Sequence, residues 1–144
     1  MMIVAGYRAM QRKSFETMAC PIARSLERVG EWWSILILRD AFAGTTRFDD
    51  FQKSLGIAPN MLTRRLAALV DAGMLERRRY SEHPPRDEYV LTGRGRDFRP
   101  VLVELVAFGR KHFATPGHTV PKRYAGVFAR RATTARKAVQ GAPA

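Results

Sequence analysis

The stretch RFDDFQKSLGIAPNMLTRRLAALVDAG constrains the fold more than any other part of the chain. Phe48, Phe51 and Leu55 recur at helical spacing, and Gly56 after them is suited to end a helix in a left-handed cap. Pro59 is suited to begin a second helix, because its missing N–H would have no intrahelical partner there. Two short amphipathic helices joined by a glycine-containing turn predict a helix-turn-helix.

The second helix of this motif has one apolar face and one polar face. Leu62, Leu66 and Leu69 recur at helical spacing and form the face expected to be buried. The opposite face is short, polar or basic in its first half, which suits a helix lying in the major groove of DNA. The residues predicted to contact DNA from this helix are Asn60, Met61, Thr63, Arg64 and Arg65. The alternative is an ordinary solvated helix face.

The two arginines of this helix have different expected roles. Arg64 is the main candidate for reading a base edge, because arginine pairs bidentately with O6 and N7 of guanine. Arg65 points partly toward the core side of the helix. A structural or phosphate-binding role is therefore as well supported for Arg65 as a base contact.

A β-hairpin is predicted directly after the helix-turn-helix. Its strands are residues 74–80 and 88–91, separated by SEHPPRD, whose paired prolines are expected to continue neither a helix nor a central strand. A helix-turn-helix followed by a hairpin is a winged helix, with the hairpin tip as the wing. The residues predicted to contact the DNA backbone or to act from the wing are Arg47, Arg77, His83 and Arg86.

Helices are also predicted on both sides of this motif. Pro21 is suited to start a helix that ends at Gly30, and residues 32–42 are apolar nearly all round, which predicts a buried core helix. Thr92 is a candidate N-cap for one long last helix. Pro100 lies inside that helical pattern and is expected to bend it.

Together these elements predict a mainly α fold with a small β-hairpin, a winged helix-turn-helix with additional N- and C-terminal dimerisation helices. The first helix carries an apolar stripe with Ile22 and Leu26, and the last carries one from Val101 to Phe108. A short chain with that much apolar stripe needs somewhere to bury it. We therefore expect a homodimer held by these two helices.

The charged residues are unevenly distributed along the chain. Lys and Arg number 25 against 13 Asp and Glu, a net charge of +12, and the residues after Glu104 include 8 basic and no acidic side chains. Such an excess favours polyanionic partners such as nucleic acid, although a basic tail alone could produce it. The predicted parts are a flexible arm (1–18), the winged helix domain with its dimerisation helices (19–115) and a basic, flexible tail (116–144), disordered or weakly helical around 124–136.

Other protein classes find little support in the sequence. No run of about 18 apolar residues is present, so no transmembrane helix or membrane partner is expected. A single cysteine excludes an intrachain disulfide framework and fits a cytoplasmic protein. His83, His112 and His118 lack the spacing and the neighbouring carboxylates of a metal or acid-base site. We expect no enzyme, no metal and no cofactor.

The chain resembles the HxlR-type winged helix-turn-helix regulators of bacteria. The likeness covers roughly residues 20–112 and is carried by CPIARSLERVG, WWSILILRDAF, GIAPNMLTRRLAALVDAGMLERRRY and EHPPRDEYVLTGRG. The resemblance implies a dimeric transcription factor whose outer helices form the dimer interface and whose winged helix binds an operator. Ala58 stands where a serine often caps the recognition helix, and His83 and Asp87 stand where apolar wing residues are frequent.

Cys20 precedes Pro21 and so stands at a helix N-terminus, where the helix dipole makes a thiol more reactive. Some members of the resembling family sense electrophiles or oxidants through a cysteine in this position. Cys20 is therefore a candidate redox sensor. The alternative is a small buried apolar side chain, the more frequent role of a lone cysteine.

These observations favour a sequence-specific DNA-binding transcriptional regulator. It is expected to act in the bacterial cytoplasm, on the nucleoid, as a homodimer on a two-fold related operator in double-stranded DNA. A thiol oxidant, an electrophile or a small ligand is the expected kind of effector. The alternative is a winged-helix interaction module that binds protein or RNA non-specifically through its basic surface.

Overall fold

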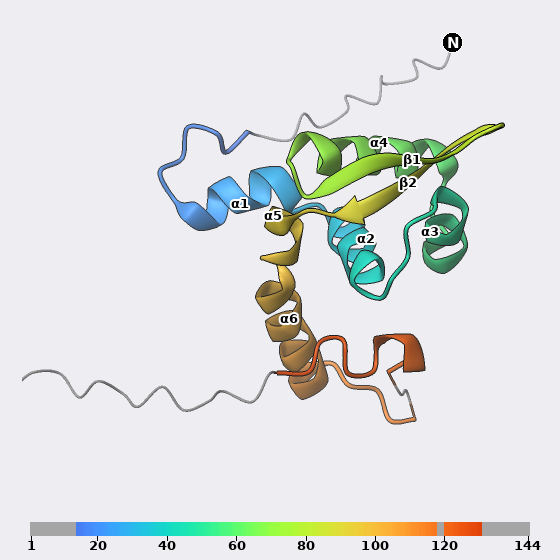
Figure 1. The fold of residues 1–144 in the computed structure, drawn as a ribbon. Coiled ribbons are helices and arrows are strands. Elements are labelled where there is room, and N and C mark those ends of the chain that lie inside the picture. Colours follow the sequence, from blue (N-terminus) through green and yellow to red (C-terminus); the bar gives the residue numbers. More distant parts are fainter. Residues whose placement is uncertain (1–13, 118–119, 131–144) are drawn as a thin grey trace, which may run out of the picture.

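The computed structural model describes residues 14–117 and 120–130, which form helices around one two-stranded antiparallel sheet (Figure 1). In chain order the elements are α1 (Pro21–Val29), α2 (Trp32–Phe42), α3 (Phe48–Leu55), α4 (Pro59–Asp71), β1 (Leu75–Glu82), β2 (Pro85–Leu91), α5 (Gly93–Arg96), α6 (Arg99–His112) and the 3₁₀ turn η1 (Lys122–Tyr124). The predicted fold class, mainly α with a small β-hairpin, is confirmed. Most of the predicted N-terminal arm lies outside the described residues.

The helix-turn-helix forms as predicted because its ends are encoded locally. Gly56 follows α3 with a φ of 62°, a left-handed conformation that glycine adopts without steric cost. Pro59 occupies the first turn of α4. On the inner face of α4, Leu62, Leu66 and Leu69 are fully buried. Truncating one such leucine to alanine typically costs about 2–5 kcal/mol of stability.

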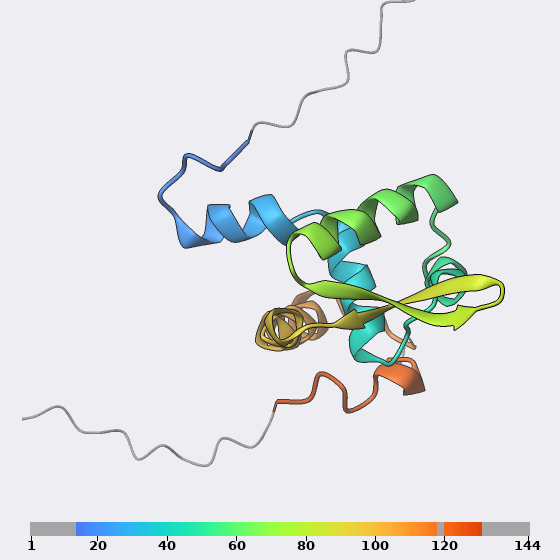
Figure 2. The same cartoon turned by 45° about the horizontal axis from the view of Figure 1, so that its top comes forward.

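The predicted core helix, α2, runs through the middle of the molecule and contacts α3, α4, β2 and α6 (Figure 2). Ile37 and Leu38 are fully buried, as expected of a core helix. Burial is not uniform around α2, because Trp32 at its start is 73% exposed. Asp40, near its other end, is a fully buried carboxylate. Apolar periodicity gives no indication of that charge in the core.

The β-hairpin is longer than predicted. Ser81 and Glu82 extend β1, and β2 begins at Pro85, so the expected loop over 81–87 is wrong and the tip is reduced to His83 and Pro84. Pro85 pairs with Glu82 at the last position of the ladder. A proline is tolerated there because a two-stranded sheet consists of edge strands, where a missing N–H need not interrupt a ladder.

The single long last helix predicted after Thr92 is also wrong. Thr92 caps the short α5, accepting a hydrogen bond from the backbone N–H of Gly95 at 3.0 Å, and α6 starts separately at Arg99. Pro100 lies in the first turn of α6, where its ring fits without bending a helix. Gly95 is packed so closely that a Cβ there would lie 2.1 Å from the carbonyl oxygen of Met74. This packing requires a glycine at position 95. The break between α5 and α6 falls where Pro100 lacks the N–H that a continuous helix would give to the Arg96 carbonyl.

Residues 120–130, here called the strap, begin at η1 beside α2 and α3 and run back to α6 (Figures 1 and 2). Tyr124 and Phe128 of the strap are buried, and the Phe128 ring packs edge-on against Phe42 of α2 with centroids 6.0 Å apart. This differs from the flexible tail or weak helix expected from composition. The physical reason is that burial of two aromatic rings against distant elements offsets the entropy lost when the segment becomes ordered. The rest of the predicted tail, 131–144, lies outside the described residues.

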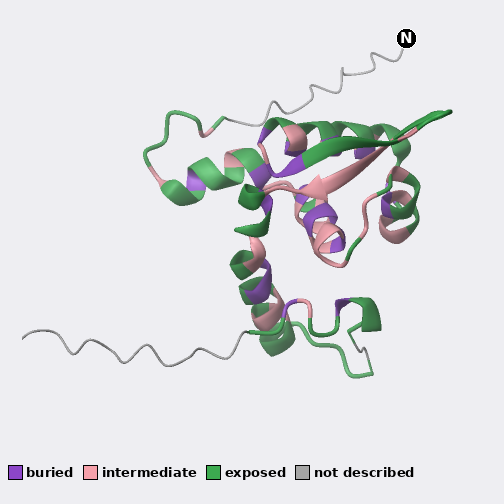
Figure 3. Ribbon diagram, in the orientation of Figure 1, coloured by how far each residue is buried: buried purple, intermediate pink, exposed green. Residues whose placement is uncertain are grey.

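Two apolar stripes stay uncovered on the outer helices. Ile22 of α1 is 71% exposed and Phe108 of α6 is 56% exposed, while Leu26, Val101 and Leu105 are each close to half exposed (Figure 3). A groove of about 1420 Å³ lies between α1 and α6, with Ile22, Leu26, Val101 and Leu105 among its lining residues. Within the described residues, none of the helices has the length and apolar character needed to cross a membrane.

Candidate nucleic-acid interface

The outer face of α4 is exposed in its first half. Asn60, Thr63 and Arg64 are exposed and Met61 is half-buried. The Thr63 hydroxyl donates to the Pro59 carbonyl at 3.0 Å, which leaves its oxygen able to accept another bond. Arg64 has no hydrogen-bond or ion-pair partner among the described residues, so its guanidinium is available to a ligand. Ala58 at the N-cap makes no side-chain capping bond, which leaves backbone N–H groups of the first turn available as well.

Arg65 is placed differently from Arg64. Its Nε lies 3.3 Å from a carboxylate oxygen of Glu31, and both side chains are partly buried. The contact is an ion pair without the alignment of a hydrogen bond. Glu31 also caps α2 by accepting from the Ser34 N–H at 3.1 Å. Of the roles left open for Arg65, this placement favours the structural one, a link between α4 and the start of α2.

The hairpin holds its own arginines in ion pairs. Arg77 lies diagonally across the strands from Asp87, with Nη2 and Oδ2 2.6 Å apart. Arg79 is the residue directly opposite Asp87, and its Nε lies 3.4 Å from Oδ1 of the same carboxylate. The hydrogen bond from Arg77 holds the pKa of Asp87 below its ordinary value, and Asp87 in turn raises the pKa of Arg77. A phosphate contact by Arg77 therefore competes with this internal pair. Arg78, in the same strand, pairs with Glu76 at 3.1 Å.

Arg47 links the helix-turn-helix to the hairpin. Its guanidinium carbon lies 4.4 Å from the ring centroid of Tyr80, a cation–π contact between the start of α3 and β1. Beside it, the Tyr89 N–H donates to the Thr46 carbonyl at 2.7 Å. Sequence reasoning chose Arg47 but missed Tyr80, whose contact joins residues far apart in the chain. The stacked guanidinium stays exposed and keeps donors for a phosphate.

His83 and Arg86 lie at the far end of the hairpin, which extends away from the body of the molecule (Figure 1). Both are exposed, and neither has a side-chain partner among the described residues. The hairpin runs beside α4 in both ribbon views, and β1 contacts α4 (Figures 1 and 2). Such an arrangement can place a helix in a major groove while the wing meets the adjacent backbone.

Within the described residues, no three His, Cys, Asp or Glu side chains gather in a group that could hold a metal ion. Cys20 is a half-buried free thiol at the N-cap of α1. The structure defines the class of protein as a winged helix, in which the helix-turn-helix of α3 and α4 is followed by the hairpin of β1 and β2.

The chain belongs to the HxlR-like helix-turn-helix family, whose model matches residues 28–116. A curated relative, the uncharacterised HTH-type transcriptional regulator Rv3095 of Mycobacterium tuberculosis, is 43% identical over 95 residues. That match covers 66% of this chain and 60% of the relative, so the chain spans about three fifths of the relative's length. The family is one of transcriptional regulators rather than enzymes.

Solved structures of similar proteins share the fold. PA1607, described as a candidate transcription factor, is 42% identical with a TM-score of 0.69, over 76% of each chain. PA1374 of Pseudomonas aeruginosa, similarly described, is 65% identical with a TM-score of 0.54, over 70% of this chain and 69% of that one. The oxidised form of the redox regulator HypR is 29% identical with a TM-score of 0.61, over 67% of this chain and all of HypR.

Proposed function

We propose that the protein regulates transcription as a homodimer that binds a two-fold related operator in double-stranded DNA. The observation that carries this proposal is the unpaired Arg64 on the exposed face of α4, beside a wing that presents Arg86. Arg64, flanked by Asn60, Met61 and Thr63, reads base edges in the major groove. Arg47, Arg86 and His83 contact the phosphate backbone around it, and Arg65 orients α4.

The dimer is supported by the uncovered apolar stripes of α1 and α6. Apolar side chains of both helices line the groove between them, with charged residues such as Arg24, Arg28 and Asp97 also in the lining. A second copy of the chain is the occupant we propose. A two-fold pairing places the same stripe on both sides of the interface, which suits its self-complementary apolar character. Two recognition helices related in this way meet half-sites about one helical turn apart.

An effector acting at Cys20 would connect this regulator to oxidants or electrophiles. Cys20 immediately precedes α1, and Pro21 and Ile22 of that helix line the proposed dimer groove. A group added to the thiol therefore stands where two subunits meet. The similarity to HypR, a redox regulator, supports a thiol-based signal. A small ligand bound in the same groove is the other effector that this geometry favours.

Selection of DNA fragments from a random pool, followed by binding titrations at two salt concentrations, tests the proposal. A regulator of this kind retains a selected, two-fold related site at salt concentrations that remove it from random DNA. Binding that disappears with salt equally for every sequence, or that prefers RNA, would instead support the interaction module. The salt comparison is needed because the net charge of +12 alone produces non-specific binding.

A further inference from the structure

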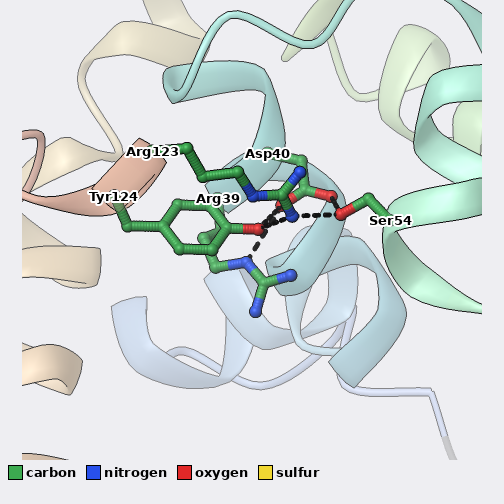
Figure 4. A network of polar contacts seen from close by, with 5 residues as sticks. All are labelled: Arg39, Asp40, Ser54, Arg123 and Tyr124. Carbon is green, nitrogen blue, oxygen red and sulfur yellow. Dashed lines mark hydrogen bonds and ion pairs between the residues drawn. The ribbon is translucent and has the colours of Figure 1, made fainter. Parts of the chain in front are cut away.

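Asp40 of α2 is fully buried, and four side chains around it satisfy its carboxylate (Figure 4). Ser54 donates its hydroxyl to Oδ2 at 2.5 Å, and Arg39 Nε lies 3.1 Å from Oδ1. The Tyr124 hydroxyl donates to Oδ1, and Arg123 Nη2 lies 3.4 Å from the same oxygen. A buried carboxylate is tolerated only when such donors replace water.

Two of these four partners come from the strap. Arg123 also donates to the Ser54 hydroxyl and to the Tyr124 oxygen, so it bridges α3 and the strap directly. The Tyr124 ring lies between two guanidinium groups, with the carbon of Arg39 4.6 Å and that of Arg123 4.5 Å from its centroid. Burial, followed by the hydrogen bond to Asp40, raises the pKa of Tyr124 above its ordinary value, so the hydroxyl keeps its proton.

The strap is held at its other end by separate contacts. Arg99, at the start of α6, donates to the carbonyl oxygens of Val127 at 2.7 Å and Ala129 at 2.9 Å. Phe128 is buried against Phe42 of α2. The strap therefore docks along its length, and its contact with Asp40 does not depend on one side chain.

The strap meets α3 at the point where α3 leads into the recognition helix. Ser54 lies in the last turn of α3, two residues before Gly56 opens the turn to α4. In both ribbon views the strap lies on the side of the molecule opposite α4 and the hairpin, away from the proposed DNA surface (Figures 1 and 2). The strap also lies beyond residues 28–116, the segment that matches the family.

We propose that Arg123 and Tyr124 are positioning residues for DNA recognition. Through Asp40 and Ser54 they fix the end of α3, and so the turn that sets the direction of α4. This inference rests on the proposed function, because it assumes that α4 reads DNA. It assigns the strap a role that charge alone does not give, since a basic segment far from the DNA surface contributes little to phosphate binding.

The test compares three variants of the full chain. Tyr124→Phe removes the hydroxyl that donates to Asp40 and accepts from Arg123. Arg123→Gln removes the guanidinium that contacts Asp40, Ser54 and Tyr124. Lys122→Gln is the matched control, because it removes the same charge from the neighbouring, exposed position without a contact to Asp40. Amide hydrogen exchange measures the opening of α3, and titrations measure affinity for a selected operator and for random DNA. Arg123→Lys tests whether a conservative cation restores both properties.

We expect Tyr124→Phe and Arg123→Gln each to speed exchange in α3 and to lower operator affinity by about tenfold, the effect of losing a hydrogen bond to a charged group. Affinity for random DNA should change little, and Arg123→Lys should recover part of both losses. Lys122→Gln should match the unmodified protein in α3 exchange and in the ratio of the two affinities. Equal effects of Lys122→Gln and Arg123→Gln would show that only charge matters and overturn the proposal.

Unchanged α3 exchange in both Tyr124→Phe and Arg123→Gln would likewise overturn it. If α3 opens faster while the operator-to-random ratio stays constant, the strap stabilises the helix but does not position it for recognition, and the proposal fails. Absence of any sequence preference in the unmodified protein would refute the proposed function instead. The exchange rates would then still decide whether the strap fixes α3, because they are measured without DNA.

Discussion

Arg64 and Arg65 are neighbours on α4, yet their side chains meet different surroundings. Arg65 is partly buried beside Glu31, whereas Arg64 is exposed and unpaired among the described residues. One residue along a helix turns the side chain by about 100°. The sequence periodicity therefore separated the two orientations correctly, but the presence of Glu31 beside Arg65 depended on how α2 packs.

Replacing Arg64 by alanine tests its assigned role. Arg64→Ala should cost about 1–3 kcal/mol of operator binding and relax the preference at one base pair, since one bidentate contact is lost. Titrations on the operator and on its single-base variants measure both effects. Arg110→Ala removes the same charge from α6, remote from the recognition helix, and is the control. A loss of the same size on operator and random DNA would count against base reading.

Replacing the sulfur of Cys20 by oxygen tests whether this thiol is a redox sensor. Cys20→Ser should keep operator affinity and lose any response to diamide or a quinone, because the serine hydroxyl is not oxidised under these conditions. A disulfide with a second subunit would require Cα atoms within about 7 Å of each other. Binding titrations of both proteins, with and without oxidant, provide the measurement. Unchanged affinity of the unmodified protein after confirmed thiol modification would leave Cys20 a packing residue.

At the scale of elements, the hairpin depends on Asp87 for its ion pairs with Arg77 and Arg79. Folding lowers the pKa of this carboxyl from its ordinary value of 3.8. The stabilisation is therefore fully present above that value and is lost as the pH falls through the lower folded-state pKa. Because Arg77 is largely exposed, the contribution of the pair should be small and should weaken in salt.

The lowered pKa of Asp87 in the folded state leads to a pH-dependent prediction for Asp87→Asn. The difference in urea midpoint between this variant and the unmodified protein should stay constant between about pH 5 and pH 8 and shrink below about pH 4. Glu82→Gln is the control, because its contact with Arg79 is longer, at 3.7 Å, and lies at an exposed position. A difference that instead grows on acidification would contradict the assigned ion pair.

The elements also show where sequence reasoning succeeds. The bounds of α2 and the ends of α3 and α4 follow from local signals, such as Gly56 and Pro59, that act within one turn. The same reasoning misplaced the prolines of the hairpin and of α6, because a proline restricts a segment without indicating whether it starts, ends or interrupts an element. The relevant neighbours, Glu82 for Pro85 and the packed Gly95 before α6, became known only from the fold.

In the candidate site, too, the exposed positions could be predicted from the sequence and the contacts between distant residues could not. Outward positions on α4 and at the wing follow from periodicity, whereas the partners of Arg65, Arg47 and Arg77 do not. The Asp40 cluster was not predictable, because Tyr124 lies 84 residues further along the chain than the carboxylate it satisfies. The strap was predicted to be basic and flexible because the composition of a whole segment hides the contribution of single aromatic residues. Tyr124 and Phe128 dock the strap.

At the scale of the whole molecule, a substitution in the middle of the α6 stripe tests the proposed dimer. Leu105→Asp should give monomers, because a charge in an apolar interface must be desolvated, and should weaken operator binding far more than binding to one half-site. Light scattering at micromolar concentration measures the mass. Arg110→Asp is the control and should remain dimeric, because Arg110 lines a pocket with Phe128 and Ala129 of the strap. A monomeric unmodified protein that binds one half-site tightly would refute the dimer.

The half-exposed stripes on α1 and α6 also bear on how a promoter would respond to this protein. While most chains are unpaired, mass action makes the number of pairs grow with the square of the chain concentration. Occupancy of the operator then follows the same square, so halving the supply of the chain removes more than half of the bound regulator. Promoter output would thus respond steeply to small changes in the rates at which the chain is made and degraded.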